Sequence, residues 1–277
     1  MSLAKTGSVE TQTVASLLKR SLQTMIRLLL SWLIAGCGAP PTPSARLLFI
    51  GNSYTYENDL PHLFAALAQA GGRPVTVDMV AVGGATLAQH LTTPDASARI
   101  TAQPWDFVVL QEQSLLPAFA QRRTTEMYPA VRTLVQLVRK AGAQPVLLLT
   151  WGRRDGFAEF GFRDYATMQD QLTKGYRTIA DELGVAVAPA GEAWRRGVAQ
   201  DAGLALWQTD GSHPSLLGSY LTACVLYVTV FSVSPVGLPA PRGISEVEAR
   251  QLQHLAYDTL LEHTERWHVP KTALPQK

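Results

Sequence analysis

The chain has 277 residues, of which 47% are hydrophobic and 17% are charged. This composition excludes a disordered chain, because such chains hold too few apolar residues to bury a core. The two cysteines exclude a disulfide scaffold and a multi-cysteine zinc site. Residues 1–36 carry four of the 24 basic side chains and one of the 22 acidic ones. The rest of the chain therefore has no basic excess, and we expect no nucleic-acid partner.

Residues 1–36 are predicted to be a bacterial lipoprotein signal peptide. Basic residues precede an apolar run at residues 28–35, which is too short to span a bilayer and is typical of a secretory signal. The sequence Ile-Ala-Gly-Cys that ends at Cys37 resembles a bacterial lipobox, which implies that Cys37 is lipidated and begins the mature chain. Residues 37–44 would then form a flexible linker. The alternatives are a plain signal peptide, a buried helix, and translation that begins at Met25.

Beyond the linker, short apolar runs alternate with helical patterns. Strands are predicted at residues 46–50, 75–82, 107–110, 146–150 and 185–188. Helices are predicted at residues 60–70, 128–140, 165–183, 216–231 and 245–267. The last helix has Ser245 and Glu248 as a possible capping box, and Cys224 is expected to be a small core residue.

This alternation predicts an α/β fold. Parallel strands need long crossover connections, and continuous apolar strands indicate a sheet that is covered on both faces. We therefore expect a three-layer α/β/α sandwich with a flavodoxin-like, parallel five-stranded sheet. It would occupy residues 45–268 as one domain, followed by a short C-terminal tail at residues 269–277.

Polar motifs follow the predicted strands, at the edge where open parallel sheets bind their ligands. After the first strand, Gly51 permits a sharp turn that would expose the Ser53 hydroxyl, although serine at such a place is more often a helix N-cap. After the second strand, Gly84 could present a free backbone N–H group. After the third strand, Gln113 could donate a side-chain hydrogen bond to an oxyanion, whereas Glu112 is interpreted as structural, bonding local backbone.

A carboxylate and a histidine stand close together near the C-terminal part of the domain. Asp210 precedes His213 by three residues, so its carboxylate can accept a hydrogen bond from Nδ1 and leave Nε2 as a base. A lone histidine is more often a surface or core residue. With Ser53 and the amide groups, however, the motifs supply a nucleophile, a base, an orienting acid and oxyanion donors.

The four motifs, in this order and spacing, resemble the four sequence blocks of the SGNH (GDSL-like) hydrolases. They are Gly-Asn-Ser-Tyr-Thr from residue 51, Gly-Gly-Ala-Thr from residue 83, Leu-Gln-Glu-Gln-Ser from residue 110 and Asp-Gly-Ser-His-Pro from residue 210. The resemblance implies that Ser53 is the nucleophile, His213 the general base and Asp210 the residue that orients it. The implied oxyanion donors are the backbone N–H groups of Ser53 and Gly84 and the side chain of Gln113.

Two positions depart from the usual family pattern. Asn52 stands where the family usually has aspartate, at a position that is mainly structural. Gln113 stands where the family usually has asparagine, and it offers the same amide on a longer stem. The chain is similar in this respect to a branch of the superfamily that carries glutamine in the third block.

Three aromatic residues are candidates for lining the substrate cleft, because sugars stack on aromatic faces. They are Tyr54, Trp151 and Trp207, for which ordinary packing is the alternative interpretation. The remaining histidines show no paired metal-ligand spacing, and no nucleotide-binding glycine loop is present. We therefore expect neither a metal nor a cofactor.

The resemblance implies two-step acyl transfer through an acyl-serine intermediate. The expected protein is a serine esterase that acts on a small ester or an acylated glycan, such as a carbohydrate O-acetylesterase of the bacterial cell envelope. It would be lipid-anchored on the periplasmic side, with the outer membrane preferred because Gly38 is not the aspartate that retains lipoproteins at the inner membrane. The alternatives are a lipase, thioesterase or acyltransferase of the same superfamily, and a non-catalytic glycan-binding or structural lipoprotein. A complete triad disfavours the non-catalytic alternatives.

Overall fold

The structure is a computed structural model, and it describes residues 44–262 and 265–269. The predicted signal peptide and the proposed lipidation site at Cys37 lie outside the described residues. No helix within the described ranges is both long enough and apolar enough to cross a membrane.

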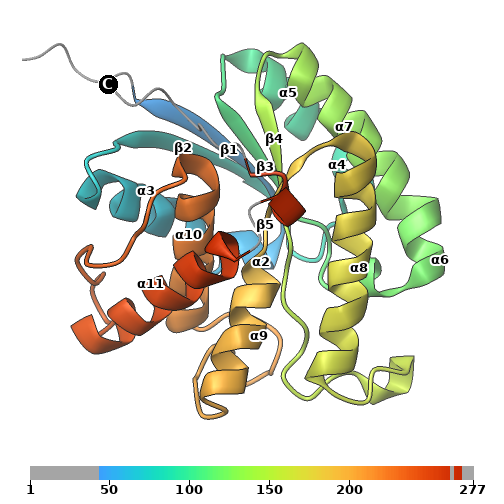
Figure 1. The fold of residues 1–277 in the computed structure, drawn as a ribbon. Helices are drawn as coiled ribbons and strands as arrows, with labels where there is room; N and C mark the ends of the chain where they lie inside the picture. The colour runs from blue at the N-terminus through green and yellow to red at the C-terminus, as the bar shows by residue number, and fades with distance from the viewer. Residues whose placement is uncertain (1–43, 263–264, 270–277) are drawn as a thin grey trace, which may run out of the picture. The chain divides into compact units, whose positions relative to one another are not determined.

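Five parallel strands form one sheet in the order β2-β1-β3-β4-β5 (Figure 1). The strands are β1 (Ala45–Gly51), β2 (Val75–Ala81), β3 (Phe107–Leu110), β4 (Gln144–Leu148) and β5 (Ala186–Ala188). Every residue of β3 is buried, whereas the edge strand β2 is half-buried. This sheet confirms the predicted five-stranded parallel arrangement.

Helices cover both faces of the sheet, which confirms the predicted three-layer fold. The longer ones are α3 (Leu60–Ala70), α4 (Leu87–Thr92), α5 (Pro94–Ala102), α7 (Tyr128–Lys140), α8 (Tyr165–Leu183), α9 (Ala190–Gln200), α10 (Leu216–Phe231) and α11 (Glu246–Leu261). Figure 1 shows α3, α10 and α11 on one side of the sheet and α4, α7 and α8 on the other. The shorter ones include α2 (Ser53–Tyr56) and α6 (Ala120–Arg122), with single helical turns at residues 57–59, 116–118, 158–160 and 265–267 and a π-helical turn at Arg123–Met127.

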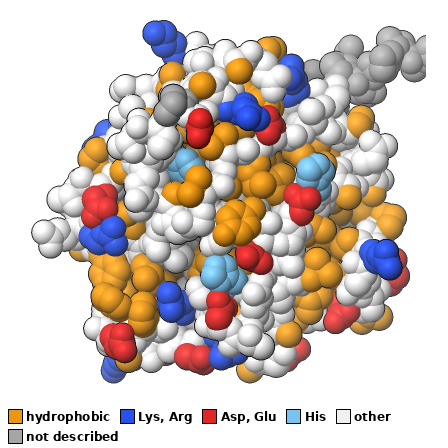
Figure 2. Space-filling view, turned by 180° about the vertical axis from the view of Figure 1, so that it is seen from behind, with side chains coloured by type: hydrophobic (Ala, Val, Ile, Leu, Met, Phe, Trp, Pro, Cys, Tyr) orange, Lys and Arg blue, Asp and Glu red, His pale blue; other side chains and the backbone are white. Residues whose placement is uncertain are grey.

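The core extends over both faces of the sheet, and on one face it includes α10, which is buried along nearly its whole length. Cys224 is fully buried there, and burial raises the pKa of its thiol well above the usual range, so it is the small core residue that the sequence predicted. The capping box of Ser245 and Glu248 is present, and it begins α11. In Figure 2, basic and acidic side chains are interspersed among apolar ones over the face shown.

The strand order reverses at β1, which lies between β2 and β3. One connection from β1 runs outward to β2, and the next crosses back past β1 to β3. A reversal of this kind opens a crevice at the carboxyl ends of the two central strands. The residues that follow β1 and β3 therefore come together at this point.

Candidate active site

The turn after β1 presents Ser53 at the carboxyl end of the sheet. Asn52 is the N-cap of α2, and its side chain accepts a hydrogen bond from the Tyr54 backbone N–H group at 3.1 Å. The same side chain donates to the carbonyl of Ala85 at 3.0 Å. An aspartate could accept the first bond but could not donate the second, which gives Asn52 a structural reason to replace the usual residue.

A second residue, Gln111, braces the same turn from β3. Its Oε1 atom accepts hydrogen bonds from the Asn52 backbone N–H group at 2.9 Å and from the Thr55 hydroxyl at 2.8 Å. A Cβ atom at Gly51 would collide with Thr55 Oγ1 and Gln111 Oε1, so the close approach of these side chains requires glycine. The sequence analysis included this glutamine in the third motif without a role of its own, and the structure shows that it holds the turn after β1.

Ser53, His213 and Asp210 form a continuous hydrogen-bonded chain. Asp210 Oδ2 accepts a hydrogen bond from His213 Nδ1 at 2.5 Å, so the proton lies on Nδ1 and the lone pair of Nε2 is free. Ser53 Oγ lies 3.0 Å from that Nε2 atom, within reach to donate its proton. The structure therefore brings together all three residues that the sequence assigned to the triad.

The loop that carries Asp210 holds its carboxylate in place. Asp210 Oδ1 accepts the backbone N–H groups of Ser212 at 2.9 Å and of His213 at 3.0 Å. Partial burial alone would raise the pKa of Asp210, but the hydrogen bonds from the His213 ring and the two N–H groups outweigh it and lower that pKa. Asp210 is thus held in its charged form, which suits a residue that orients an imidazole.

A stack of aromatic rings supports this loop from below. The ring of Tyr54 stacks on Trp151 with centroids 4.8 Å apart, and Trp151 stacks on Trp194 at 4.1 Å. Trp151 Nε1 donates to the carbonyl of Ser212 at 3.1 Å, and the Tyr54 and His213 rings form a T-shaped pair with centroids 5.7 Å apart. The stack therefore fixes both the loop backbone and the plane of the imidazole.

The prediction that Tyr54 and Trp151 line the substrate cleft is wrong. Tyr54 is 2% exposed and Trp151 is 0% exposed. Both rings are therefore packed in the interior, and neither offers a face to a ligand. Trp207 is half-buried, with Nε1 donating to the carbonyl of Gly152 at 3.0 Å and its ring against Trp194. Its contact with substrate stays a prediction.

The exposed aromatic residue beside the site is Tyr56, which the sequence analysis did not single out. Its side chain is 40% exposed, and its hydroxyl lies near Gly83, in the loop that follows β2. Val82, which is 58% exposed, begins the same loop. Tyr56 therefore offers an exposed ring beside the loop that carries Gly83 and Gly84. No sequence signal pointed to Tyr56, because an exposed tyrosine in a short helix has no distinguishing pattern.

The three expected oxyanion donors occupy suitable elements. The N–H group of Ser53 stands at the first position of α2, and Gly84 is exposed with a φ of +69°, a conformation that favours glycine. Among the hydrogen bonds of the described chain, none engages either N–H group. Both groups are therefore available to a ligand.

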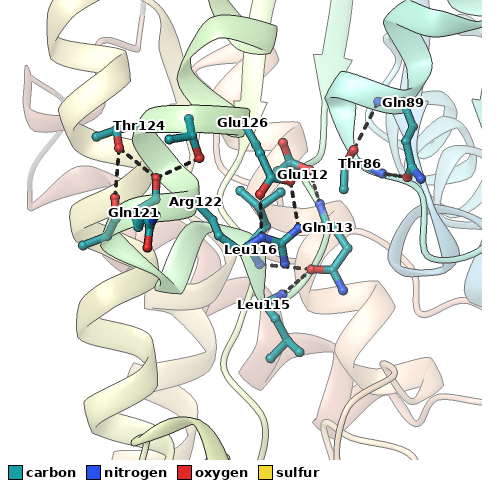
Figure 3. Close-up of polar contacts among 12 residues, drawn as sticks. Thr86, Gln89, Glu112, Gln113, Leu115, Leu116, Gln121, Arg122, Thr124 and Glu126 are labelled. Carbon is teal, nitrogen blue, oxygen red and sulfur yellow. Dashed lines mark hydrogen bonds and ion pairs between the residues drawn. The ribbon is translucent and has the colours of Figure 1, made fainter.

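Gln113 presents its amide in a fixed orientation (Figure 3). Its Oε1 atom accepts the backbone N–H groups of Leu115 at 2.8 Å and Leu116 at 3.0 Å, where the chain begins a helical turn. With the oxygen held in this way, the NH₂ group faces away from that turn, with only a long contact of 3.4 Å to Ser114 Oγ. The two hydrogen bonds therefore hold the Gln113 side chain in one orientation.

A separate cavity of about 340 Å³ lies between α8, α9 and the C-terminal helical turn. It is lined by side chains of both charges, including Lys174, Arg177 and Asp170, and by none of the predicted site residues. The residues of the predicted triad meet elsewhere, at the carboxyl end of the sheet.

The chain resembles several proteins of known structure. A protein from Slackia heliotrinireducens that is assigned to the SGNH hydrolases is 33% identical, over 66% of this chain and 97% of its own, with a TM-score of 0.58. A DUF4886 family protein from Bacteroides uniformis is 18% identical, over 79% of this chain and 95% of its own, with a TM-score of 0.67. A variant of an acetyl-xylooligosaccharide esterase from Geobacillus is 19% identical, over 66% of this chain and 92% of its own, with a TM-score of 0.51.

A scan of protein-family models and a search of curated proteins find no match. The two more distant structures share the fold with this chain. The Slackia protein shares more, since this chain covers nearly all of it at one-third identity. Sequence blocks, sheet order and this likeness agree, and the chain belongs to the SGNH hydrolases.

Proposed function

We propose that this chain is a serine esterase in which Ser53 is the nucleophile, His213 the general base and Asp210 the residue that orients it. The observation that carries the proposal is the contact of 3.0 Å between Ser53 Oγ and His213 Nε2, with Asp210 on the opposite nitrogen of the same ring. A serine hydroxyl is a weak nucleophile until an adjacent base accepts its proton. The geometry supplies that base in the tautomer it needs.

In the first step, His213 Nε2 takes the proton of Ser53, whose oxygen bonds to the ester carbonyl carbon. The carbonyl oxygen becomes an oxyanion that the N–H groups of Ser53 and Gly84 and the amide of Gln113 would stabilise. The imidazolium then returns its proton to the departing alcohol as the tetrahedral intermediate collapses. In the second step, His213 takes a proton from water, whose oxygen bonds to the acyl carbon of the acyl-serine. The imidazolium then returns a proton to Ser53 Oγ as the bond between that oxygen and the acyl carbon breaks, and the acid is released.

The exposure of the triad suits the second step. The side chain of His213 is 34% exposed and that of Asp210 is 46% exposed. Water can therefore reach the acyl-serine without a rearrangement of the loop. This openness favours a hydrolase over an acyltransferase, which must keep water away from its acyl-enzyme.

We propose an O-acetylated carbohydrate as the substrate class. The exposed ring of Tyr56 lies beside the Gly83–Gly84 loop, where a sugar that carries the ester could stack on it. The fold is shared with an acetyl-xylooligosaccharide esterase. A test compares acetylated xylo-oligosaccharide with p-nitrophenyl esters of acetate and of a long-chain acid, and faster hydrolysis of the long-chain ester would contradict this choice.

The proposal places the esterase on the bacterial cell envelope, held by lipid on Cys37. It rests on the leader sequence, whose basic residues, short apolar run and Ile-Ala-Gly-Cys end are those of a lipoprotein signal. Metabolic labelling with a fatty-acid probe tests it. We expect label on the wild-type chain and none on Cys37→Ala, and label retained in that variant would contradict the anchor.

The catalytic proposal is tested with the purified full chain on p-nitrophenyl acetate. We expect Ser53→Ala and His213→Ala each to lower kcat by at least about 10³-fold, because members of a triad act as a unit. His62 gives a matched control: its ring contacts Asp59, three residues before it, at 2.8 Å and on the surface. His62→Ala should leave kcat unchanged. Wild-type turnover in folded Ser53→Ala would refute the proposal.

A further inference from the structure

One buried carboxyl group has no part in the chemistry above. Glu112 follows β3 directly and is 0% exposed. Its Oε1 atom accepts the backbone N–H group of Gln113 at 2.7 Å and that of Leu87 at 3.1 Å. Figure 3 shows Glu112 directly beside the Gln113 backbone.

The two N–H groups belong to the two segments that carry the proposed oxyanion donors other than Ser53, namely Gln113 and Gly84. Gln113 is itself the side-chain donor, and Leu87 begins α4, three residues after Gly84. These segments are 25 residues apart in sequence and follow different strands. A single oxygen atom of Glu112 therefore joins them.

Thr86 and Gln89 fix the start of α4, which carries the Leu87 N–H group that Glu112 accepts. They form a capping box that holds the first turn of α4 (Figure 3). The N–H group of Leu87 is thus presented to Glu112 by a rigid turn, and a shift of one segment is transmitted to the other. On the other side, the Glu112 backbone N–H group donates to the hydroxyl of Tyr176 at 3.2 Å.

The bridge made by Glu112 costs free energy at this position. The second oxygen of its carboxyl group, Oε2, is buried and has no hydrogen-bond partner among the described residues. Leaving a buried polar atom unpaired costs free energy, so the two N–H groups are joined at the expense of one unpaired oxygen. Burial also raises the pKa of Glu112 to about 7. Such costs are typical of groups retained for function.

We propose that Glu112 is a positioning residue of the esterase, which fixes the Gly84 loop and Gln113 at the spacing that an ester oxyanion needs. This inference rests on the proposed function. Without the two hydrogen bonds to Glu112, each segment would keep its fold, but the position of one relative to the other would no longer be fixed. The oxyanion forms only in the transition state, so the loss should appear in kcat and leave KM nearly unchanged.

The test measures kcat and KM of the full chain on p-nitrophenyl acetate for three variants of Glu112. Glu112→Gln keeps an oxygen that accepts both N–H groups, and we expect kcat within about threefold of wild type. Glu112→Leu removes the acceptor, and we expect kcat to fall by about ten- to a hundredfold with KM changed less than threefold. Glu112→Asp is one methylene shorter and should also lose kcat, so it serves if the leucine variant does not fold.

Gln253 provides the matched control, since it is a buried polar residue outside the site. It accepts the Gly237 N–H group at 2.9 Å and donates to the Tyr220 hydroxyl and the Leu238 carbonyl. Gln253→Leu also removes buried hydrogen bonds, but we expect it to leave kcat unchanged. Circular dichroism and thermal unfolding establish that each variant is folded.

Each outcome decides something different. A folded Glu112→Leu or Glu112→Asp with wild-type kcat overturns the positioning role and leaves the esterase intact. Equal losses of kcat in Glu112→Leu and Gln253→Leu also overturn it, because they show a general loss of stability. A wild-type chain that hydrolyses no faster than Ser53→Ala refutes the esterase itself, and the positioning role with it.

Discussion

Replacing Glu112 with glutamine should stabilise the fold above neutral pH and change it little in acid. Burial, the largest influence, raises the pKa of this carboxyl group from its ordinary 4.5 to about 7 in the folded chain. Between these two values the folded protein keeps a proton that the unfolded chain has released. The stability that this proton confers is fully present below pH 4.5 and is lost as the pH rises through about 7. A glutamine does not titrate in this range, so the variant does not undergo this decrease in stability.

The size of the effect follows from the same interval. Hydrogen bonds from the Gln113 and Leu87 N–H groups favour the charged form, as does Arg122, whereas Glu126 disfavours it, and burial outweighs them. The remaining span from 4.5 to about 7 corresponds to about 3.5 kcal/mol of unfolding free energy, at roughly 1.4 kcal/mol for each pH unit. The stability of wild type should thus decline by about this amount relative to Glu112→Gln.

Urea unfolding at about pH 5 and about pH 8 measures this decline. We expect the difference between Glu112→Gln and wild type to grow by about 2–3 kcal/mol in favour of the variant from the lower to the higher pH. Glu182→Gln serves as the control, since Glu182 is an exposed acid paired with Arg132 and should give no such gain. The reasoning would be refuted if the difference in unfolding free energy between Glu112→Gln and wild type were equal at both pH values. It would also be refuted if the variant were less stable than wild type at the higher pH.

Three further changes test the site. Gln113→Ala should lower kcat by about 10²–10³ and leave KM within threefold in steady-state kinetics, and a loss of less than threefold would remove its role as an oxyanion donor. Trp151→Ala should cost about 3–5 kcal/mol of unfolding free energy in urea, since it removes the centre of a buried aromatic stack. An unchanged unfolding transition would contradict the assigned packing. Tyr56→Ala should raise KM for acetylated xylo-oligosaccharide but not for p-nitrophenyl acetate, and equal effects on both substrates would exclude stacking of the sugar.

The strands and long helices could be predicted because their apolar patterns are continuous. The helix at residues 60–70 and the strand at residues 107–110 have the predicted bounds. Strand β4 begins at Gln144, two residues before its predicted start, because hydrogen bonding to β3 rather than hydrophobicity sets its limits. Helices α4, α5 and α9 were not predicted, since they are short or rich in alanine and glycine. The helix propensity of the α4 sequence is weak, and α4 is stabilised by its capping box and by tertiary packing.

The resemblance of the four sequence blocks to the SGNH hydrolases also predicted which side chains of the triad would meet. The burial of the aromatic side chains near the site could not be predicted in this way. Trp151 follows a strand as a cleft residue would, yet it lies below the loop rather than above it. The bracing by Gln111 and the bridge made by Glu112 join residues far apart in sequence. Glu112 does bond local backbone as predicted, through Gln113, but its second bond depends on where β2 ends relative to β3.

The central claim is that Ser53 is a nucleophile activated by His213. Incubation of the full chain with a fluorophosphonate, followed by intact-mass and peptide mass spectrometry, tests it most directly. We expect one phosphonyl group per chain, located on Ser53, and none on Ser53→Ala or His213→Ala. A folded wild-type chain that takes up no label, or one that carries it on another serine, would contradict the account.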